Sequence, residues 1–568
     1  MSVLDKPQTF LIAFGRKYRD LKRLLRSTST ALTGFSAFVP DHLTMIPKTL
    51  RTADRQIAGE FYNGRYFLGG ALVDTAGKSP FSVREAEKSW LEALHNFSWL
   101  RHFSAKHDRL AENYARAMIM EWVNTGTTNQ KDIAWSPETT SLRLISWLCN
   151  SNIILTNCDH EFYRMFMRCL GTHVRHLIRY APTMPEGRPK LLAYLALSYA
   201  SICHHKQQET LKFARDRLAK ELDAQILPDG GHISRNPMQI VEILSLLLPF
   251  RQSCLTADIS LPAEIHTSIE RMFPAVRFFR MGDGNLARFN GSGRLNPDLI
   301  ATMLRHDEVR GEPVMHATYS GYQRITDGES IVIMDVGNPP KGEHSSAAHA
   351  GCLSFEFSSG PECIIVNCGT PTYPKIEPIK VWRTSAAHST PVMYETSSCR
   401  FENILDRDNQ LSGQILTRNL EVSSERLETA DQVTVQGEHA GYVRQFGALV
   451  QRTLVLGNHG HQILGCDEFT AQDKSELKYS TRDHTEIHFH LHPDVKPFVN
   501  ADNPAEIVLE TRLKQQWKFS CKEVNPTIEE SIFFASLSGS RRKAYRISLQ
   551  FGASSIPKIN WTLEKIKT

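Results

Sequence analysis

The 568-residue sequence lacks several patterns that would place it in a specialised class of protein. Its 11 cysteines include no CxxC pair, and cysteines such as Cys149, Cys169 and Cys203 lie among apolar residues. Thiols in such surroundings pack as small hydrophobic side chains, so we expect no disulfide framework. The sequence also lacks a dense basic run, because its net charge of +5 comes from 66 basic and 61 acidic residues. This small excess gives weak support for an anionic ligand and none for nucleic acid.

Long apolar runs are missing as well. No apolar segment is long enough to span a bilayer, and the first residues do not have the form of a secretory signal. We therefore expect no membrane span and a cytoplasmic location, and the oligomeric state stays open. No glycine-rich phosphate loop follows a strand, and "GSGR" at residues 291–294 is predicted as a turn.

The first half of the chain has helical periodicity. In "SVREAEKSWLEALHNFSWLRHFS", Trp90, Leu94, Phe97 and Leu100 recur every three or four residues, which is one face of a helix. Similar runs follow with short polar links, as expected for antiparallel helical hairpins in a bundle, a solenoid or a closed ring. The sequence has no fixed-period repeat, so a ring or an irregular array is favoured.

The pattern changes at about residue 283, where many short β segments are bounded by Gly, Asn, Asp and Pro. Such segments are typical of an antiparallel β-sandwich. The sequence therefore predicts a multidomain α-then-β fold, with an α-helical domain at 1–285 and a β-sandwich at 286–568. Because ligand clefts often lie between domains, we expect the site there.

The segment "ELDAQILPDGGHISRNPMQ" at residues 221–239 is the first candidate for chemistry. Pro228 and the Gly230–Gly231 pair predict a tight loop, and Asn236 before Pro237 suits a helix start. His232 and Arg235 would then lie near a helix N-terminus, which attracts anions. The alternative is a plain turn between two helices.

Two histidines beside β segments form the second candidate. His349 and His388, together with Asn367 or a thiolate from Cys368, could hold a divalent zinc ion. The alternative is that both histidines make structural hydrogen bonds. In "TEIHFHLHP", three further histidines alternate and so share one face of a strand: His488, His490 and His492. A metal ion bound there would need another ligand from a different part of the chain.

The third candidate is Arg143, in "AWSPETTSLRLISW". Aromatic rings stack on sugar faces and an arginine forks onto a carboxylate, so Arg143 with Trp135 and Trp147 suits an acidic sugar. The alternative is an amphipathic helix that packs its tryptophans in the core.

Taken together, these blocks resemble the heparinase II/III-like polysaccharide lyases. The resemblance rests on the two helical segments above and, in the β half, on "GYQRITDGESIVIMDVGNPP", "AHAGCLSFEFSSG", "IIVNCGT" and "WRTSAAHST". It implies an (α/α) toroid followed by a β-sandwich, and β-elimination on a uronic-acid polysaccharide without a redox cofactor. It also implies that some relatives hold a structural zinc and that family members are often periplasmic.

This sequence departs from the family pattern at several positions. Gln239 stands where the resemblance implies a catalytic Tyr, and Gly187–Arg188 replaces an Asn-His pair. Ala347 replaces the first sandwich His, while His349 matches a histidine that binds zinc in some relatives. Asn367 replaces an Asp, and His388 matches the later His.

Two functional hypotheses follow. The first is a lyase that cleaves an anionic polysaccharide or oligosaccharide at the cleft between the domains. In it His232, His349 and Tyr322 would move protons, and a larger set would bind substrate: Arg143, Arg188, Arg235, Asn236 and Gln239. A structural zinc would be held by His349, Asn367 and His388. The second is a catalytically inactive glycan-binding or exopolysaccharide-assembly protein on the same scaffold. A glycoside hydrolase is less favoured, because no convincing carboxylate pair is found.

Overall fold

The computed structural model describes residues 14–15, 17–18, 21, 42–105, 108–125, 133–204, 211–371, 381–402, 413–415, 417, 419–500, 503–536 and 541–566. The chain divides into two compact units, Met1–Gln225 with Glu242–Ile269 and Ile226–Val241 with Glu270–Thr568. The predicted boundary at residues 285/286 differs from this division. The loop around Asp229 bonds to Ser320, and Arg324 bonds to the end of helix α12, so both segments belong with the strands.

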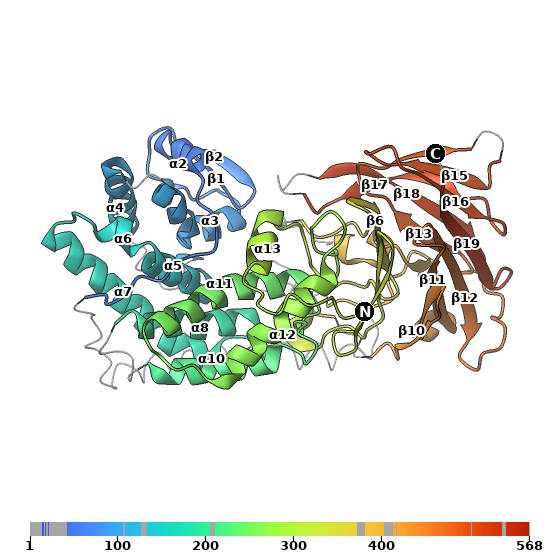
Figure 1. The fold of residues 1–568 in the computed structure, drawn as a ribbon, viewed down its shortest axis with the longest axis horizontal. Coiled ribbons are helices and arrows are strands. Elements are labelled where there is room, and N and C mark those ends of the chain that lie inside the picture. The colour runs from blue at the N-terminus through green and yellow to red at the C-terminus, as the bar shows by residue number, and fades with distance from the viewer. Residues whose placement is uncertain are drawn as a thin grey trace. The chain divides into compact units, whose positions relative to one another are not determined.

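The first unit is built mainly of helices (Figure 1). Helix α5 packs against α7 and α8, and α8 packs against α10. Every residue of α8 from Leu191 to Ile202 is buried, which is the pattern of a central helix. Within the described ranges the helices are α2 Arg55–Tyr62, α3 Lys88–His95, α4 Arg109–Asn124, α5 Pro137–Cys149, α6 Ser151–Leu155, α7 His160–Tyr180, α8 Arg188–Ile202, α10 Lys212–Gln225, α11 Pro237–Thr256, α12 Ala263–Phe279, α13 Pro297–Leu304 and α14 Val443–Phe446.

Two features of this unit differ from the helical prediction. A short hairpin pairs β1, Arg65–Leu68, with β2, Ala71–Asp74. The single helix predicted over residues 82–104 is also broken: α3 ends at His95 and a 3₁₀ segment spans Ser98–Ala105. Phe97 has φ of +56°, so no α-helix can continue through it. The periodic residues of this segment are nevertheless all buried.

The described residues of the second unit form three antiparallel sheets. The five-stranded sheet has the order β3-β4-β5-β6-β7, the four-stranded sheet β17-β18-β13-β8 and the eight-stranded sheet β14-β15-β16-β19-β12-β11-β10-β9. An isolated bridge between Ile365 and Leu491 joins the first two. The strands are β3 His316–Ala317, β4 Tyr322–Asp327, β5 Ser330–Asp335, β6 Phe355–Ser359, β7 Glu362–Ile365, β8 Pro391–Met393, β9 Ser423–Glu428, β10 Gln432–Tyr442, β11 Ala448–Gly457, β12 Gln462–Ala471, β13 Thr485–His490, β14 Lys496–Val499, β15 Glu506–Glu510, β16 Gln516–Cys521, β17 Thr527–Phe533, β18 Arg542–Phe551 and β19 Lys558–Lys565.

A fully buried ion pair lies among the apolar side chains of the sandwich core. Arg452 on β11 bonds to Asp467 on β12 at 2.6 Å and to the backbone oxygens of Leu353 and Ser389. Trp561 donates its ring N–H to the same carboxylate. These bonds satisfy the buried charges, so the pair links β11 and β12 to two loops.

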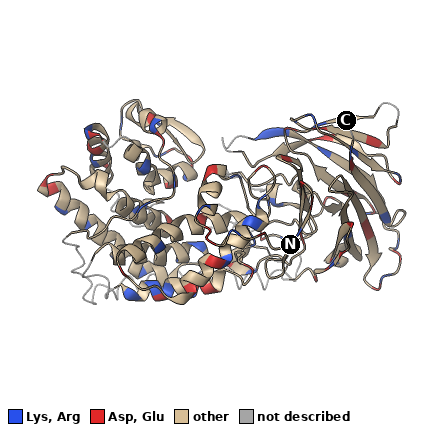
Figure 2. Cartoon of the chain, viewed as in Figure 1, with Lys and Arg blue, Asp and Glu red and all other residues tan. Residues whose placement is uncertain are grey.

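The predicted order of a helical region followed by antiparallel sheets is confirmed. Lysine and arginine are interspersed with aspartate and glutamate along both the helices and the strands (Figure 2). Among the described residues, no helix combines the length and the hydropathy that a membrane crossing requires.

Candidate functional site

The loop between α10 and α11 carries the first predicted site residues and belongs to the β unit. Gly230 has φ of +81°, and a Cβ there would meet the backbone oxygen of Arg271 at 1.8 Å, so only glycine fits. Asp229 accepts hydrogen bonds from Ser320, which ties the loop to the turn before β4. His232 is 3% exposed, and its Nδ1 accepts the Ser234 amide N–H at 3.1 Å. The loop therefore has a fixed, bonded conformation.

Arg235 is buried rather than available to a substrate. Its guanidinium bonds to the Asp335 carboxylate at 2.5 Å and to four backbone oxygens, those of Ser320, Gly321, Gly337 and Asn338. The Asp335 carboxylate raises the pKa of Arg235 against the opposing effect of burial. The predicted role of Arg235 in binding a sugar carboxylate does not fit, because every N–H group of its guanidinium already donates to another acceptor.

Tyr322 is likewise enclosed. Its side chain has 0% exposure, its hydroxyl donates to the backbone oxygen of Arg235 at 2.7 Å, and Asn290 donates to it at 2.7 Å. Burial raises the pKa of Tyr322 above its ordinary value. A general base must reach the proton that it removes, so the geometry does not support the predicted proton-transfer role.

His349 and His388 form a hydrogen-bonded chain whose proton positions follow from its ends. His388 Nδ1 lies 2.7 Å from the Thr384 carbonyl, which can only accept, so Nδ1 carries the hydrogen. Burial lowers the pKa of His388 to about 4, so its Nε2 is bare and accepts from His349 Nδ1 at 3.0 Å. His349 Nε2 then accepts from the Thr370 hydroxyl at 3.1 Å.

This chain leaves His349 without a free nitrogen for chemistry. The residue is 4% exposed, and burial, with His388 and Arg383 nearby, lowers its pKa well below the ordinary value. Its backbone N–H bonds to Asn290, the residue that also contacts Tyr322. The structure thus joins His349 and Tyr322 through Asn290 in one network of structural hydrogen bonds.

The predicted zinc site does not fit the residues present. His349 and His388 direct their facing nitrogens at each other, and Asn367 is neutral with its Oδ1 bonded to the Ser389 N–H. The Nδ2 of Asn367 is buried without a partner. Zinc sites of proteins need three or four protein ligands, and the described part of the chain has no group of three metal-binding side chains.

His488 and His490 of the sandwich are also bonded. His488 contacts Glu486 at 2.7 Å and Arg546 at 2.6 Å, and His490 contacts Ser531 at 2.8 Å. His492 lies beyond the end of β13, so it does not continue the strand face.

Two predicted substrate-binding arginines lie in the helical unit. Arg143 is 0% exposed, donates to His173 at 2.7 Å and to two backbone oxygens, and lies 4.3 Å from the ring centre of Trp122. Burial lowers the pKa of Arg143 to about 9. The core alternative is therefore correct for Arg143. Arg188 is partly exposed but forms ion pairs with Glu138 and Glu242.

Comparison with known proteins identifies the second half of the chain. Residues 309–562 match the family model described as "Heparinase II/III-like, C-terminal". This part of the chain therefore resembles the C-terminal domain of heparinase II/III-like proteins. The predicted resemblance is thereby confirmed.

Solved structures show that the likeness extends to the fold. The crystal structure of heparinase III matches with a TM-score of 0.68 and 13% identity over 86% of this chain and 79% of that chain. Heparan sulfate lyase HepC from Pedobacter heparinus matches with a TM-score of 0.59 and 14% identity, over 98% and 88% of the two chains. Members of the heparinase II/III family are polysaccharide lyases.

A curated relative carries a different description. "FtsZ-localized protein C" from Caulobacter vibrioides (strain NA1000 / CB15N) is 27% identical over 533 residues, which are 93% of this chain and 91% of the relative.

Ala347, one of the positions altered from the heparinase-like pattern, lies near the start of helix α11. A Cβ on Gly291 would be 3.1 Å from Asn236 Nδ2 and 3.2 Å from the Cβ of Ala347. Asn236 caps helix α11 by accepting the Met238 N–H at 2.9 Å, and the partly buried Gln239 follows on its first turn. The resemblance implies a Tyr and a His at positions 239 and 347, but neither Gln239 nor Ala347 titrates.

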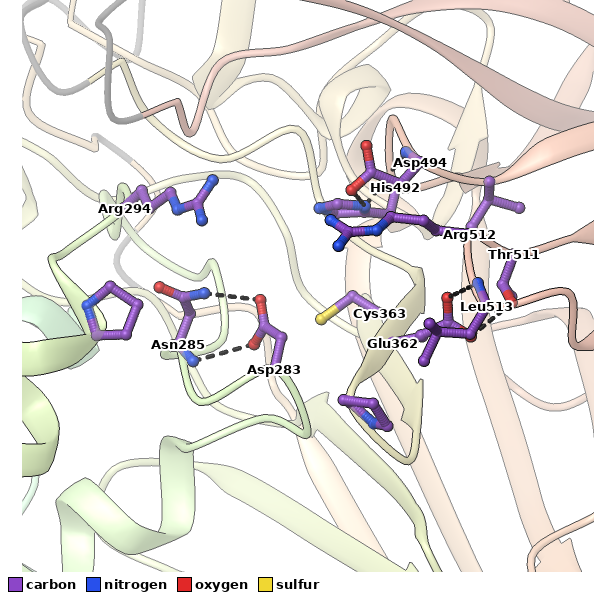
Figure 3. Close-up of a pocket in the computed structure, with 13 residues that line it drawn as sticks. Asp283, Asn285, Arg294, Glu362, Cys363, His492, Asp494, Thr511, Arg512 and Leu513 are labelled. Atoms are coloured by element: carbon purple, nitrogen blue, oxygen red, sulfur yellow. Dashed lines mark hydrogen bonds and ion pairs between the residues drawn. The ribbon is translucent and has the colours of Figure 1, made fainter.

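Sequence reasoning missed a separate pocket in the β unit. It is lined by residues from 283–297, 361–363, 492–495 and 511–513, and it has a volume of about 280 Å³ (Figure 3). Of the residues singled out in the sequence, His492 lines it, and none of those predicted for proton transfer or substrate binding does. "GSGR" supplies one of its arginines, Arg294, but a local pattern does not reveal which distant loops meet there.

Proposed function

We propose that this heparinase-like protein is not a lyase and acts as a non-catalytic protein located at FtsZ assemblies. The observation that carries the proposal is the state of the proton-transfer candidates. β-Elimination needs a base for the proton beside the uronate carboxylate and an acid for the leaving oxygen. Tyr322 and His349 are buried and bonded, and the side chains of Gln239 and Ala347 cannot act as an acid or a base.

The curated relative supports the location. It is named for its localisation with FtsZ, and the match spans more than nine-tenths of both chains. In this proposal the protein can still bind an anionic glycan, but it does not cleave it. The predicted cytoplasmic location stays a prediction that the same experiments test.

A product assay tests the loss of catalysis. Purified full-length protein is incubated with heparin, heparan sulfate, alginate and hyaluronan, with heparinase III as the positive control. We expect no absorbance from a conjugated 4,5-unsaturated uronate and no change in polymer length by chromatography. Formation of that product, and its loss in His232→Ala, would refute the proposal.

A localisation experiment tests the second part. A fluorescent fusion of the full chain is imaged in cells of the source bacterium before and after depletion of FtsZ. We expect foci or bands that coincide with FtsZ and disperse when FtsZ is depleted. A distribution that ignores FtsZ would contradict the proposal.

The second candidate is a lyase acting on an anionic, uronic-acid-containing polysaccharide. It is favoured by the heparinase III fold and by the matching C-terminal domain. In this case a group other than Tyr322 must accept the proton, and His232, on the loop beside Asn236, is the nearest candidate in sequence to the altered position 239. The product assay separates the two candidates directly.

A further inference from the structure

The pocket of the β unit has the features of a small-molecule site. Its volume of about 280 Å³ is close to the lower end of the range for ligand pockets. Arg294 and Asn285 lie on one side of it, and Cys363, His492 and Arg512 lie on the other (Figure 3). All of these residues belong to the same compact unit.

The carboxylates of the pocket already have partners. Asp283 accepts from the Asn285 backbone and side-chain N–H groups at 3.0 and 2.7 Å, and Arg288 lies 3.7 Å away. Arg288 and Asn285 hold the pKa of Asp283 below its ordinary value although burial opposes them. The other two acids are bonded in the same way: Glu362 to Thr511 and the Leu513 N–H, and Asp494 to Arg542.

Two arginines of the pocket have donors available for a ligand. Among the described residues, neither Arg294 nor Arg512 makes a hydrogen bond, and the Nε of Arg294 is buried without a partner. A buried donor left unpaired costs about 1–3 kcal/mol, so Arg294 Nε is suited to a partner that the described residues do not supply. His492 adds a third donor. Its Nδ1 accepts the Asp494 amide N–H at 3.3 Å, which leaves Nε2–H for a ligand when the ring is neutral.

The pocket also holds one uncommitted acceptor. Asn285 is 4% exposed, and its Oδ1 is buried without a partner while its Nδ2 bonds to Asp283. An amide oxygen in this state suits a hydroxyl group. We infer that this pocket binds a small hydroxylated oxyanion, whose phosphate or carboxylate contacts Arg294 and Arg512 and whose hydroxyl donates to Asn285.

Calorimetry with the full-length protein at low salt tests the inference. The probes are glucose 1-phosphate, glucuronate and neutral glucose, and the two anions distinguish a phosphate ligand from a carboxylate ligand. We expect at least one anion to bind and glucose to bind at least tenfold more weakly. Arg294→Gln and Arg512→Gln should each weaken anion binding about tenfold, because each removes a charged hydrogen-bond donor.

Two control variants lose the same charge outside the pocket. Lys514→Gln lies two residues after Arg512 and Arg305→Gln lies at the end of α13, and both should bind the anion as the wild type does. Arg512 is exposed, so Arg512→Gln remains informative even if Arg294→Gln fails to fold. The inference is overturned if neither anion binds, if glucose binds equally well, or if Arg512→Gln binds as tightly as Lys514→Gln. These outcomes do not depend on whether the protein is a lyase.

Discussion

Replacing Arg235 by methionine tests whether this residue has a structural role. The proposal of a non-catalytic protein depends on that role. In the folded protein its guanidinium serves the Asp335 carboxylate and four backbone oxygens, and it lies 4.6 Å from the ring centre of Tyr322. A substrate-binding arginine would instead keep its donors free, and its loss would change binding far more than stability.

The expected loss in the free energy of unfolding follows from the buried groups that lose their hydrogen-bond donor in Arg235→Met. Each buried carbonyl that loses its donor costs about 1–3 kcal/mol, and a buried charge stripped of its partner costs about 3–5 kcal/mol. These costs do not add fully, so we expect a loss of at least about 4 kcal/mol in the free energy of unfolding of the β unit. Arg235→Lys keeps the charge but not the planar fork, and it should lose about half as much.

Hydrogen exchange across a urea series is the suitable assay, because the two compact units can unfold separately. Peptides that cover β4 and β5 report on the unit that contains Arg235. The control is Arg305→Met, on the exposed end of α13, which should change stability by less than about 0.5 kcal/mol. If Arg235→Met stays within about 1 kcal/mol of the wild type, the structural assignment is wrong.

Three further predictions concern the β unit. Thr370→Val removes the hydroxyl that donates to His349 and should lower the urea stability by about 1–2 kcal/mol, whereas Thr370→Ser should stay near the wild type. Gly465→Ala should lower the melting temperature in calorimetry, because its Cβ would lie 2.0 Å from ring atoms of Trp561; an unchanged melting temperature would count against this packing. Burial, with Arg452 nearby, lowers the pKa of His439 to about 4, so the unfolded chain binds more protons between pH 6.5 and 4. Stability should therefore fall as pH drops through this range, and His439→Asn, which can still accept the Gly441 N–H, should reduce the slope of the urea midpoint against pH.

Much of the architecture could be predicted because helices and strands each give a local periodicity of apolar residues in the sequence. The buried residues of the segment 82–104 recur at helical spacing, and β11 alternates buried and half-buried residues as a strand does. The break at Phe97 could not be predicted in this way, since its positive φ depends on the ring packing around it. The β1–β2 hairpin was missed for a similar reason: its four-residue strands are too short for a clear period.

The candidate site was harder to predict than the fold. A sequence shows which residue types are present, but not which hydrogen bonds they already make. Arg143 illustrates the difference, because its aromatic neighbours suit both a sugar site and a core, and only its bonds to His173 and two carbonyls decide between them. The pocket around Arg294 is the opposite case, since four segments far apart in the chain meet there.

The buried network and the altered positions of the heparinase-like pattern differ in how strongly stability constrains them. Arg235, Asp335, Asn290 and Tyr322 are joined by hydrogen bonds that fix the loop before α11, and removing any of them leaves a buried polar group without a partner. Gln239 and Ala347 are less enclosed, because the first is partly buried and the second is exposed. Substitutions at such positions usually change stability little. Stability therefore constrains the buried network more than positions 239 and 347, so the loop before α11 can keep its shape when those two residues change.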